Sequence, residues 1–330
     1  MTIVPSATPI SWQSRIVHLL VRARMRPSAH ADAPIDPLWV RREMGRPRAA
    51  RRWMARSTGA TMEPRTAGHG WPGGEVVSWP GHAPGAPVLL YLHGGGYIAC
   101  SPETHRPLVS SLVRRVRGRA FVPRYRLAPE HPFPAALDDA LAAYRYLLDV
   151  ERIAPAQIVI AGDSAGGGLA LALALAIRDA AWPNPAGLVA FCPWTDLAAT
   201  GRSLEENTER CAMFAGETIR RAARFYVGSA DPMRPLISPL YGDFRGLPPM
   251  LVHASEDEVL RDDAIRVADA ARRAGVHVEL QLWPHVPHVW QFFAAVLPEA
   301  RASLTAATRF MLARMSRPEH MNAAASTSAS

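Results

Sequence analysis

The sequence predicts an α/β fold in which a mostly parallel central sheet is flanked by helices. From about residue 76 onward, apolar runs of strand length alternate with longer helical stretches. These runs are almost continuously apolar, which is typical of parallel strands covered on both faces. The expected strands are VVSWP (76–80), PVLLYLH (87–93), AFVPRYRL (120–127), QIVIAG (157–162), GLVAFCP (187–193), MLVHAS (250–255) and VHVELQLW (276–283). The expected helices between them cover residues 104–118, 135–150, 169–177 and 261–275.

Two other parts of the chain lack this alternation. Residues 1–75 contain two arginine-rich amphipathic stretches, SRIVHLLVRARM (14–25) and LWVRREMGRPRAARRWMA (38–55), so we expect a helical arm there. The interval from Trp194 to Leu247 has no strand-like run but includes the helical GETIRRAARFYVG (216–228). An insertion at that position would lie above the carboxyl edge of the sheet, where ligands bind.

These patterns predict five segments along the chain. Residues 1–75 form a helical arm that is part of a cap, and residues 194–247 form a cap insertion. Residues 76–193 and 248–315 together form the α/β core. Residues 316–330 form a disordered tail, because NAAASTSAS is of low complexity.

Composition restricts the protein class. No apolar run approaches the roughly 18 residues of a membrane span, and the longest, LALALALAI (169–177), is expected to be a buried helix. The apolar stretch IVHLLV (16–21) is short and closely followed by arginines, so we expect no signal peptide. The three cysteines form no CxxC pair, which is typical of reduced thiols in a cytoplasmic protein.

The chain contains no lysine, so all 37 basic side chains other than histidine are arginine. A Walker phosphate loop, a Schiff base and a Ser-Lys dyad each need lysine and are therefore excluded. Residues 1–56 hold eleven arginines and three acidic residues, which equals the whole net charge of +8. This arm is either a solvated helical surface or a site for anionic membranes. Since no aromatic-interleaved basic motif accompanies it, we expect no nucleic-acid partner.

A candidate nucleophile follows the strand QIVIAG. The residues Gly162 to Gly166 read G-x-S-x-G between that strand and an apolar helix, which is the context this motif requires. Ser164 would occupy a strained turn, and side chains at 162 and 166 would collide with the neighbouring elements. The alternative is a glycine-rich turn that holds a phosphate. We expect Asp163 to brace the turn or to face the substrate pocket.

The stretch YLHGGGY (91–97) places three glycines directly after a buried strand. A serine that attacks a carbonyl creates an oxyanion, which needs backbone N–H donors worth about 3 kcal/mol each. We expect Gly95, Gly96 and Ala165 to donate, while Gly94 permits the bend. A plain glycine hinge is the alternative, and His93 is expected to fix the loop by hydrogen bonds.

Several motifs together resemble one known family. They are HGGGY (93–97), YRLAPEHPFPAAL (125–137), GDSAGG (162–167), EVLRDD (258–263) and PHVW (287–290). This set resembles the bacterial hormone-sensitive-lipase-like esterases of the α/β-hydrolase superfamily. The resemblance implies a cap and hydrolysis of carboxylic esters with short or medium acyl chains. A fuller pattern, with SPETH (101–105) and residues 238–263, resembles a branch often labelled lactone or acetyl-ester hydrolase.

The resemblance also implies a base and an acid in the order serine, acid, histidine. The family histidine precedes an aromatic-rich helix, which matches His288, with His285 as the alternative. The family motif D-x-L-x-D-[DE], aligned on LRDD, places Glu258 at the position of the catalytic aspartate. This is a departure, because glutamate needs more room, and Asp257 is the alternative.

The remaining expectations concern neighbouring residues and partners. We expect Arg126 and Glu130 to form a buried brace, and Tyr97 to line the substrate pocket. No metal or organic cofactor is implied. The expected partner is a small-molecule ester, with no stable membrane insertion and with homodimer formation as a possibility. The predicted enzyme is a serine carboxylesterase, and the rival functions are a lactone hydrolase and a non-catalytic ligand-binding protein.

Overall fold

The computed structural model describes residues 10–26, 35–45, 55 and 58–315. Its centre is an eight-stranded sheet of order β1-β2-β4-β3-β5-β6-β7-β8. Strands β3 to β8 pair in parallel, whereas β2 pairs antiparallel with both β1 and β4. The strands are β1 Thr61–Arg65, β2 Gly74–Ser78, β3 Val88–Leu92, β4 Arg119–Pro123, β5 Ile158–Asp163, β6 Gly187–Phe191, β7 Met250–Ser255 and β8 Val278–Trp283. The predicted α/β fold with a mostly parallel sheet is therefore confirmed.

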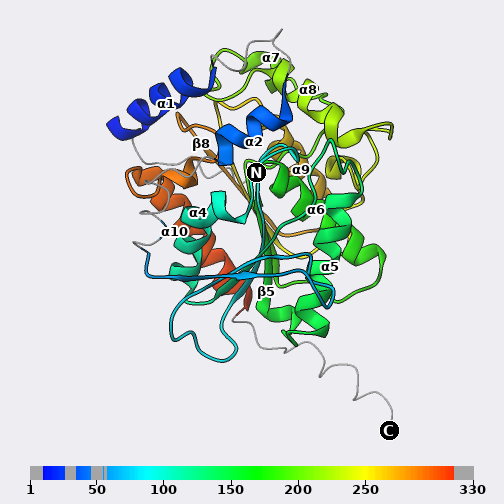
Figure 1. Ribbon diagram of the computed structural model, residues 1–330. Coiled ribbons are helices and arrows are strands. Elements are labelled where there is room, and N and C mark those ends of the chain that lie inside the picture. Colours follow the sequence, from blue (N-terminus) through cyan, green and yellow to red (C-terminus); the bar gives the residue numbers. More distant parts are fainter. Residues whose placement is uncertain (1–9, 27–34, 46–54, 56–57, 316–330) are drawn as a thin grey trace.

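Helices cover both faces of the sheet (Figure 1). Helices α4 (Pro102–Val116) and α10 (Pro298–Met315) bury one face, and their apolar side chains share a core cluster with β3 and β4. Helices α5 (Ala135–Asp149), α6 (Ala165–Asp179) and α9 (Arg261–Arg273) lie on the other face. Burial on both faces explains why the central strands are apolar at almost every position.

The first strand was not predicted. Residues 1–75 were expected to form a helical arm, but β1 pairs with β2 over five residues, from Thr61 opposite Ser78 to Arg65 opposite Gly74. Its sequence, TMEPR, has no apolar alternation because β1 is an edge strand whose side chains are largely exposed. Pro64 is tolerated there, since an edge strand has one row of backbone groups without partners.

The remaining helices cover the end of the sheet where its parallel strands finish (Figure 1). The predicted arm contains α1 (Trp12–Met25) and α2 (Pro37–Gly45), while residues 46–54 of the second predicted helix lie outside the described residues. The segment 194–247 contains α7 (Ser203–Glu206), α8 (Gly216–Val227) and the 3-10 turn η3 (Pro239–Tyr241), and no strand. Two further 3-10 turns are η2 (Pro155–Gln157) and η4 (Trp290–Phe293). The predicted tail, 316–330, lies outside the described residues.

Among the described residues, no helix is both long and apolar enough to cross a bilayer. The apolar run at 169–177 lies within α6, whose side chains there are almost all buried in the core. Its apolar character therefore reflects a central helix of the fold.

Candidate active site

Ser164 lies on a strained turn between β5 and α6. Its backbone has φ 54° and ψ −123°, a conformation that costs a non-glycine residue about 1–3 kcal/mol. The turn is held by a hydrogen bond from the Ser164 N–H to the Phe191 carbonyl at 2.8 Å, and the Ser164 carbonyl accepts from Trp194 at 2.9 Å. These two hydrogen bonds hold Ser164 in its strained backbone conformation.

The flanking glycines permit this turn because no side chain fits beside it. A Cβ on Gly162 would lie 2.3 Å from the carbonyl oxygen of Gly166. A Cβ on Gly166 would lie 2.1 Å from the carbonyl oxygen of Leu92. Both distances are far below van der Waals contact, so the predicted steric reason for G-x-S-x-G agrees with the packing of this turn.

His288 lies on the loop after β8 and is almost fully buried. Its Nδ1 is 2.5 Å from Oε2 of Glu258. Its Nε2 is buried without a hydrogen-bond partner among the residues that the structure describes. A histidine held by an acid at one nitrogen and unpartnered at the other has the arrangement that a general base requires.

Glu258 lies on the loop after β7, and its second carboxylate oxygen accepts a hydrogen bond from the Ser255 N–H at 2.7 Å. The thiol of Cys192 lies beside this pair, since ligand atoms of Cys192, Glu258 and His288 are all within 4.8 Å of one another. Burial and the Glu258 carboxylate raise the pKa of the Cys192 thiol well above its ordinary value. The sequence analysis did not identify Cys192 as a neighbour of the active site. Its position directly after β6, at the carboxyl edge of the sheet, could have indicated this.

The two alternatives from the sequence, His285 and Asp257, also lie together. Nδ1 of His285 is 3.2 Å from a carboxylate oxygen of Asp257, and Arg210 binds the other oxygen of that carboxylate. Unlike His288, the His285 side chain is 48% exposed. The structure therefore pairs His288 with Glu258 and His285 with Asp257.

The three glycines after β3 form a tight turn. Gly95 and Gly96 have φ of 124° and 64°, and the Gly95 carbonyl accepts from the N–H groups of Ile98 and Ala99. The N–H groups of Gly95 and Gly96 donate to no acceptor within the described part of the chain. Ala165 begins α6, so its N–H has no acceptor inside the helix. All three remain available to an oxyanion.

A buried network holds this turn from behind. The Gly94 N–H lies 3.2 Å from both Oδ1 of Asp163 and Nε2 of His105. The Tyr91 hydroxyl donates to Asp163 at 2.7 Å. Burial alone would raise the pKa of Asp163, but His105 and the Tyr91 hydroxyl outweigh burial and lower it.

Of the two roles expected for Asp163, its contacts fit the brace and not the pocket wall. A Cβ on Gly94 would lie 2.3 Å from the Asp163 carboxylate, which shows how closely the two pack. His105 was missed as a partner, although it lies in the quoted SPETH pattern. His93 is buried and stacks on Tyr125 with ring centroids 4.2 Å apart. Burial lowers the pKa of His93 to about 3, so its ring is neutral.

Residues from the predicted cap lie over the site. The Phe214 ring contacts the His288 ring edge to face, with centroids 5.4 Å apart. Tyr97 is buried and stacks on Tyr226 of α8, with centroids 3.7 Å apart. Tyr97 therefore joins the glycine turn to the segment 194–247.

The expected brace between Arg126 and Glu130 was wrong. Arg126 pairs with Asp139 at 2.9 Å, near the molecular surface. Glu130 instead accepts two hydrogen bonds from Arg41 of α2, at 2.8 and 2.6 Å. The sequence could not reveal this pairing because Arg41 is 89 residues away in the chain.

Arg41 also binds the loop that follows the glycine turn. Its guanidinium donates to the carbonyls of Ile98 and Ala128, both at 2.7 Å. Helix α2 is thereby attached to the backbone just beyond Tyr97.

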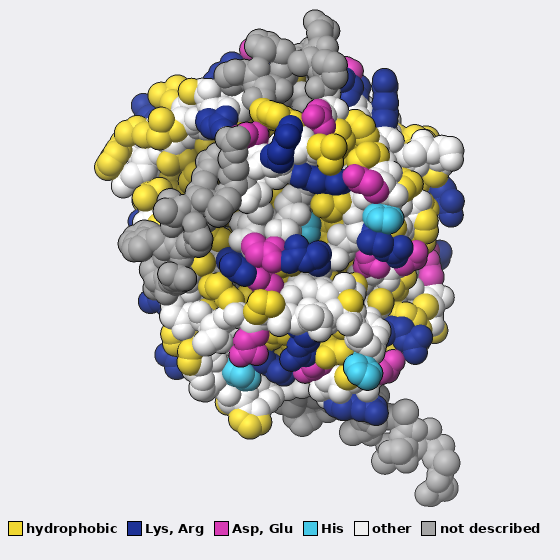
Figure 2. All heavy atoms as spheres, viewed as in Figure 1, with side chains coloured by type: hydrophobic (Ala, Val, Ile, Leu, Met, Phe, Trp, Pro, Cys, Tyr) yellow, Lys and Arg dark blue, Asp and Glu magenta, His cyan; other side chains and the backbone are white. Residues whose placement is uncertain are grey.

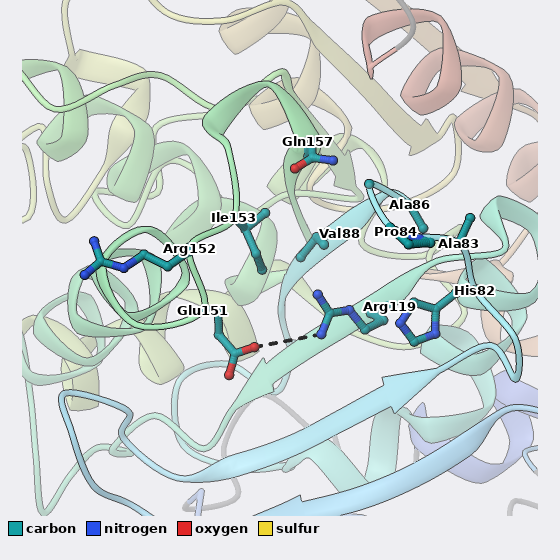
Figure 3. Close-up of a pocket in the computed structure, with 11 residues that line it drawn as sticks. His82, Ala83, Pro84, Ala86, Val88, Arg119, Glu151, Arg152, Ile153 and Gln157 are labelled. Atoms are coloured by element: carbon teal, nitrogen blue, oxygen red, sulfur yellow. Dashed lines mark ion pairs between the residues drawn. The ribbon is translucent and has the colours of Figure 1, made fainter.

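A separate hollow of about 360 Å³ lies at the opposite end of the sheet (Figure 3). It is bordered by Val88 and Arg119, at the amino ends of β3 and β4, and Arg119 faces Glu151 at 3.8 Å. Its lining has no nucleophile beside a base. Ligands of this fold class bind at the carboxyl ends of the strands, where Ser164 and His288 lie.

Comparison with known proteins agrees with this geometry. The family model for the alpha/beta hydrolase fold matches residues 89–292. An acetyl-hydrolase from Streptomyces hygroscopicus is 44% identical over 224 residues, which cover 68% of this chain and 75% of that protein. An esterase from Acinetobacter venetianus is 36% identical over 224 residues, covering 68% of this chain and 74% of that protein.

Solved structures are similar over most of the chain. The crystal structure of EstE5 soaked with p-nitrophenyl butyrate has a TM-score of 0.84 and 34% identity, and it covers 93% of this chain and 100% of its own. An esterase from the bacterial hormone-sensitive lipase family has a TM-score of 0.79 and 36% identity, with the same coverage. This chain therefore belongs to the α/β-hydrolase fold family, among its hormone-sensitive-lipase-like esterases, and it is a serine carboxylesterase.

Proposed function

We propose that Ser164, His288 and Glu258 form the catalytic triad that hydrolyses carboxylic esters with short or medium acyl chains. The observation that carries this proposal is the buried His288 ring, whose Nδ1 binds Glu258 and whose Nε2 has no partner within the described residues. An unpartnered buried nitrogen costs free energy in the folded protein, and a role as the base accounts for why this cost is retained.

In the first half of the reaction, Nε2 of His288 takes the proton of the Ser164 hydroxyl as the serine attacks the ester carbonyl. Glu258 keeps the proton of His288 on Nδ1 and stabilises the imidazolium that forms. The oxyanion accepts hydrogen bonds from the N–H groups of Gly95, Gly96 and Ala165. Because these groups are fixed by the turn and by the start of α6, they need no reorganisation during the reaction.

The first half ends when the bond between the carbonyl carbon and the alkoxy oxygen breaks: His288 gives its proton to the departing alcohol, and the acyl group remains on Ser164. Water then enters, His288 takes one of its protons, and the same oxyanion contacts form again. The bond between the acyl carbon and the serine oxygen then breaks, His288 returns its proton to that oxygen, and the carboxylic acid is released. Every step uses side chains and backbone groups of this chain.

The chain-length range is supported by two relatives. One is named an acetyl-hydrolase, and the EstE5 crystal was soaked with a butyrate ester. In this chain, the Phe214 ring packs against the His288 ring, beside the position where the acyl chain would bind.

The test is hydrolysis of p-nitrophenyl acetate, butyrate, octanoate and palmitate by wild type and by Ser164→Ala. We expect the highest kcat/KM on acetate or butyrate and a loss of about 10⁴-fold or more in Ser164→Ala. Activity that survives in Ser164→Ala would contradict the triad, and a maximum on palmitate would contradict the chain-length range. An ε-lactone that reacts faster than every acyl ester would favour the lactone hydrolase.

Two expectations about location and assembly complete this proposal. We expect a cytoplasmic protein, which is supported by three described cysteines that form no disulfide. We also propose a homodimer, to be tested by sedimentation analysis; a monomer at micromolar concentration would contradict it.

A further inference from the structure

Helix α1 carries apolar side chains on two opposite faces. Ser14, Val17 and Val21 are buried on its inner face. On the outer face lie apolar side chains that remain exposed: Trp12 (68%), Ile16 (46%), Leu19 (64%) and Leu20 (64%). Their spacing brings them to one side of a helix, so they form a continuous stripe. A helical surface that is merely solvated would be polar there.

Helix α2 also carries exposed apolar side chains. Leu38 and Trp39 are exposed by 60% and 41%. An ion pair between Arg24 and Glu43 at 3.3 Å holds the two helices beside each other. Figure 2 shows hydrophobic side chains gathered over α1, at the upper left of the molecule. We name the six exposed side chains the docking face: Trp12, Ile16, Leu19, Leu20, Leu38 and Trp39.

Arginines border the docking face. Arg22 and Arg26 share one carboxylate, that of Glu209, at 3.5 and 3.4 Å. Arg15 and Arg42 are exposed and form no ion pair with any residue that the structure describes. The border of the docking face therefore carries more positive than negative charge.

We propose that the docking face binds the surface of an anionic lipid bilayer, with α1 lying in the plane of the interface. Helices that bind in this way combine an apolar face with arginines that contact anionic headgroups. Tryptophan is favoured at this depth because its ring is apolar and its N–H is polar. The charged border distinguishes this surface from a purely apolar contact between two copies.

Docking would bring the active site to the membrane. The inner face of α1 packs on Ala212 and Phe293, and the Ser14 hydroxyl donates to the His285 carbonyl at 2.5 Å. That carbonyl is three residues before His288. The same helix thus covers the loop of the proposed base on one side and presents the docking face on the other.

The experiment is co-sedimentation of the full-length protein with vesicles of phosphatidylcholine, with and without phosphatidylglycerol. The test variant is Leu19→Glu/Leu20→Glu. The matched control is Val150→Glu/Met233→Glu, since Val150 and Met233 are also exposed apolar residues, at 48% and 49%, and lie outside the arm. A second variant, Arg15→Gln/Arg42→Gln, removes charge and leaves the apolar stripe.

We expect wild type and the control to bind vesicles that contain phosphatidylglycerol, and the test variant to bind at least about tenfold more weakly. The charge variant should lose its preference for anionic vesicles. Raising the salt from about 0.1 M to about 1 M shortens the Debye length from about 10 Å to about 3 Å, so wild-type binding should weaken. Hydrolysis of soluble p-nitrophenyl acetate should be equal in all four proteins.

Three results would overturn the proposal. They are no binding of wild type to anionic vesicles, equal loss in the test and control variants, and binding that is indifferent to charge and salt. A wild-type dimer that Leu19→Glu/Leu20→Glu dissociates would assign the stripe to contact between copies instead. Since vesicle binding is measured without an ester, this outcome is independent of the proposed triad.

Discussion

Two histidine–acid pairs share the loops after β7 and β8: His288 with Glu258 and His285 with Asp257, and the two histidines differ in burial. In the inner pair, His288 and Glu258 have side chains exposed by 4% and 1%. In the outer pair, His285 is 48% exposed and Asp257 is also bound by Arg210. Both acids are buried, with Asp257 exposed by only 5%, so it is the two histidines that differ in their screening by water.

The difference in burial between the two histidines indicates which pair is suited to catalysis. A hydrogen bond between charged groups is stronger where water is excluded. Among the described residues, no arginine binds the inner carboxylate and competes with the histidine. The inner pair also leaves Nε2 of His288 without a partner within the described residues, whereas the outer ring lies partly in solvent. Sequence position alone separates these pairs poorly, because both acids follow β7 and both histidines follow β8.

The largest expected effect comes from removing the histidines one at a time. His288→Ala should lower kcat/KM on p-nitrophenyl butyrate by about 10⁴-fold or more, because the serine loses its base. His285→Ala should change kcat/KM by less than about tenfold, since the ring is exposed and outside the inner pair. Equal losses in the two variants would break the comparison.

The acids should follow with a slightly smaller effect. Glu258→Ala should lower kcat by about 10³- to 10⁴-fold with little change in KM, because His288 loses the group that fixes its tautomer. Asp257→Ala should retain most of the activity. Steady-state kinetics on the same ester would decide this, and a collapse in Asp257→Ala alone would transfer the acid role to Asp257.

A third pair, His105 and Asp163, tests whether a buried histidine needs an unpartnered ring nitrogen to act as a base. His105 is as buried as His288, but its Nε2 contacts Asp163 and its Nδ1 contacts the Thr104 hydroxyl at 2.9 Å. Asp163→Asn should lower kcat by about 10- to 100-fold and leave KM nearly unchanged, because the glycine turn would lose its brace. Circular dichroism that matches wild type would exclude misfolding, and unchanged kcat would contradict the brace.

The smallest expected effect concerns a histidine that is buried without an acidic partner among the described residues. Burial lowers the pKa of His253 to about 3. The folded state therefore binds fewer protons than the unfolded state between about pH 3 and the unfolded value of about 6.5. Stability is complete above pH 6.5 and should fall by about 1.4 kcal/mol per pH unit below it for this group.

Urea unfolding of wild type and His253→Gln from pH 7 to pH 5 would measure this effect. The free energy of unfolding should fall less steeply with decreasing pH in the variant, since glutamine does not titrate. Parallel curves for the two proteins would show that His253 is not the group responsible. The absolute stability of the variant does not enter this comparison.

The sequence predicted the features that depend on local patterns. Continuous apolar runs identified the parallel strands, and G-x-S-x-G between a strand and a helix located the turn of Ser164. Features that depend on pairing across the chain were missed. Strand β1 owes its conformation to β2 and not to its own residues, and Glu130 binds Arg41 instead of the nearby Arg126.

In the active site, too, local sequence patterns identified the candidate residues but not their pairing across the chain. Both candidate acids and both candidate histidines could be named, but their assignment to pairs depends on the path of two loops. The partners of Asp163 depend on where α4 places His105, which no local motif encodes. Such contacts between distant segments are determined by packing, so a single sequence does not reveal them.

The contacts of Arg41 bear on how modular this enzyme is. One side chain from the N-terminal arm holds the Ile98 and Ala128 carbonyls and the Glu130 carboxylate, directly beyond the turn that is to receive the oxyanion. The N-terminal arm therefore cannot be truncated, or replaced by the arm of a relative, without loss of these contacts. A chimera that imports a foreign arm would have to import its carbonyl-binding arginine in register.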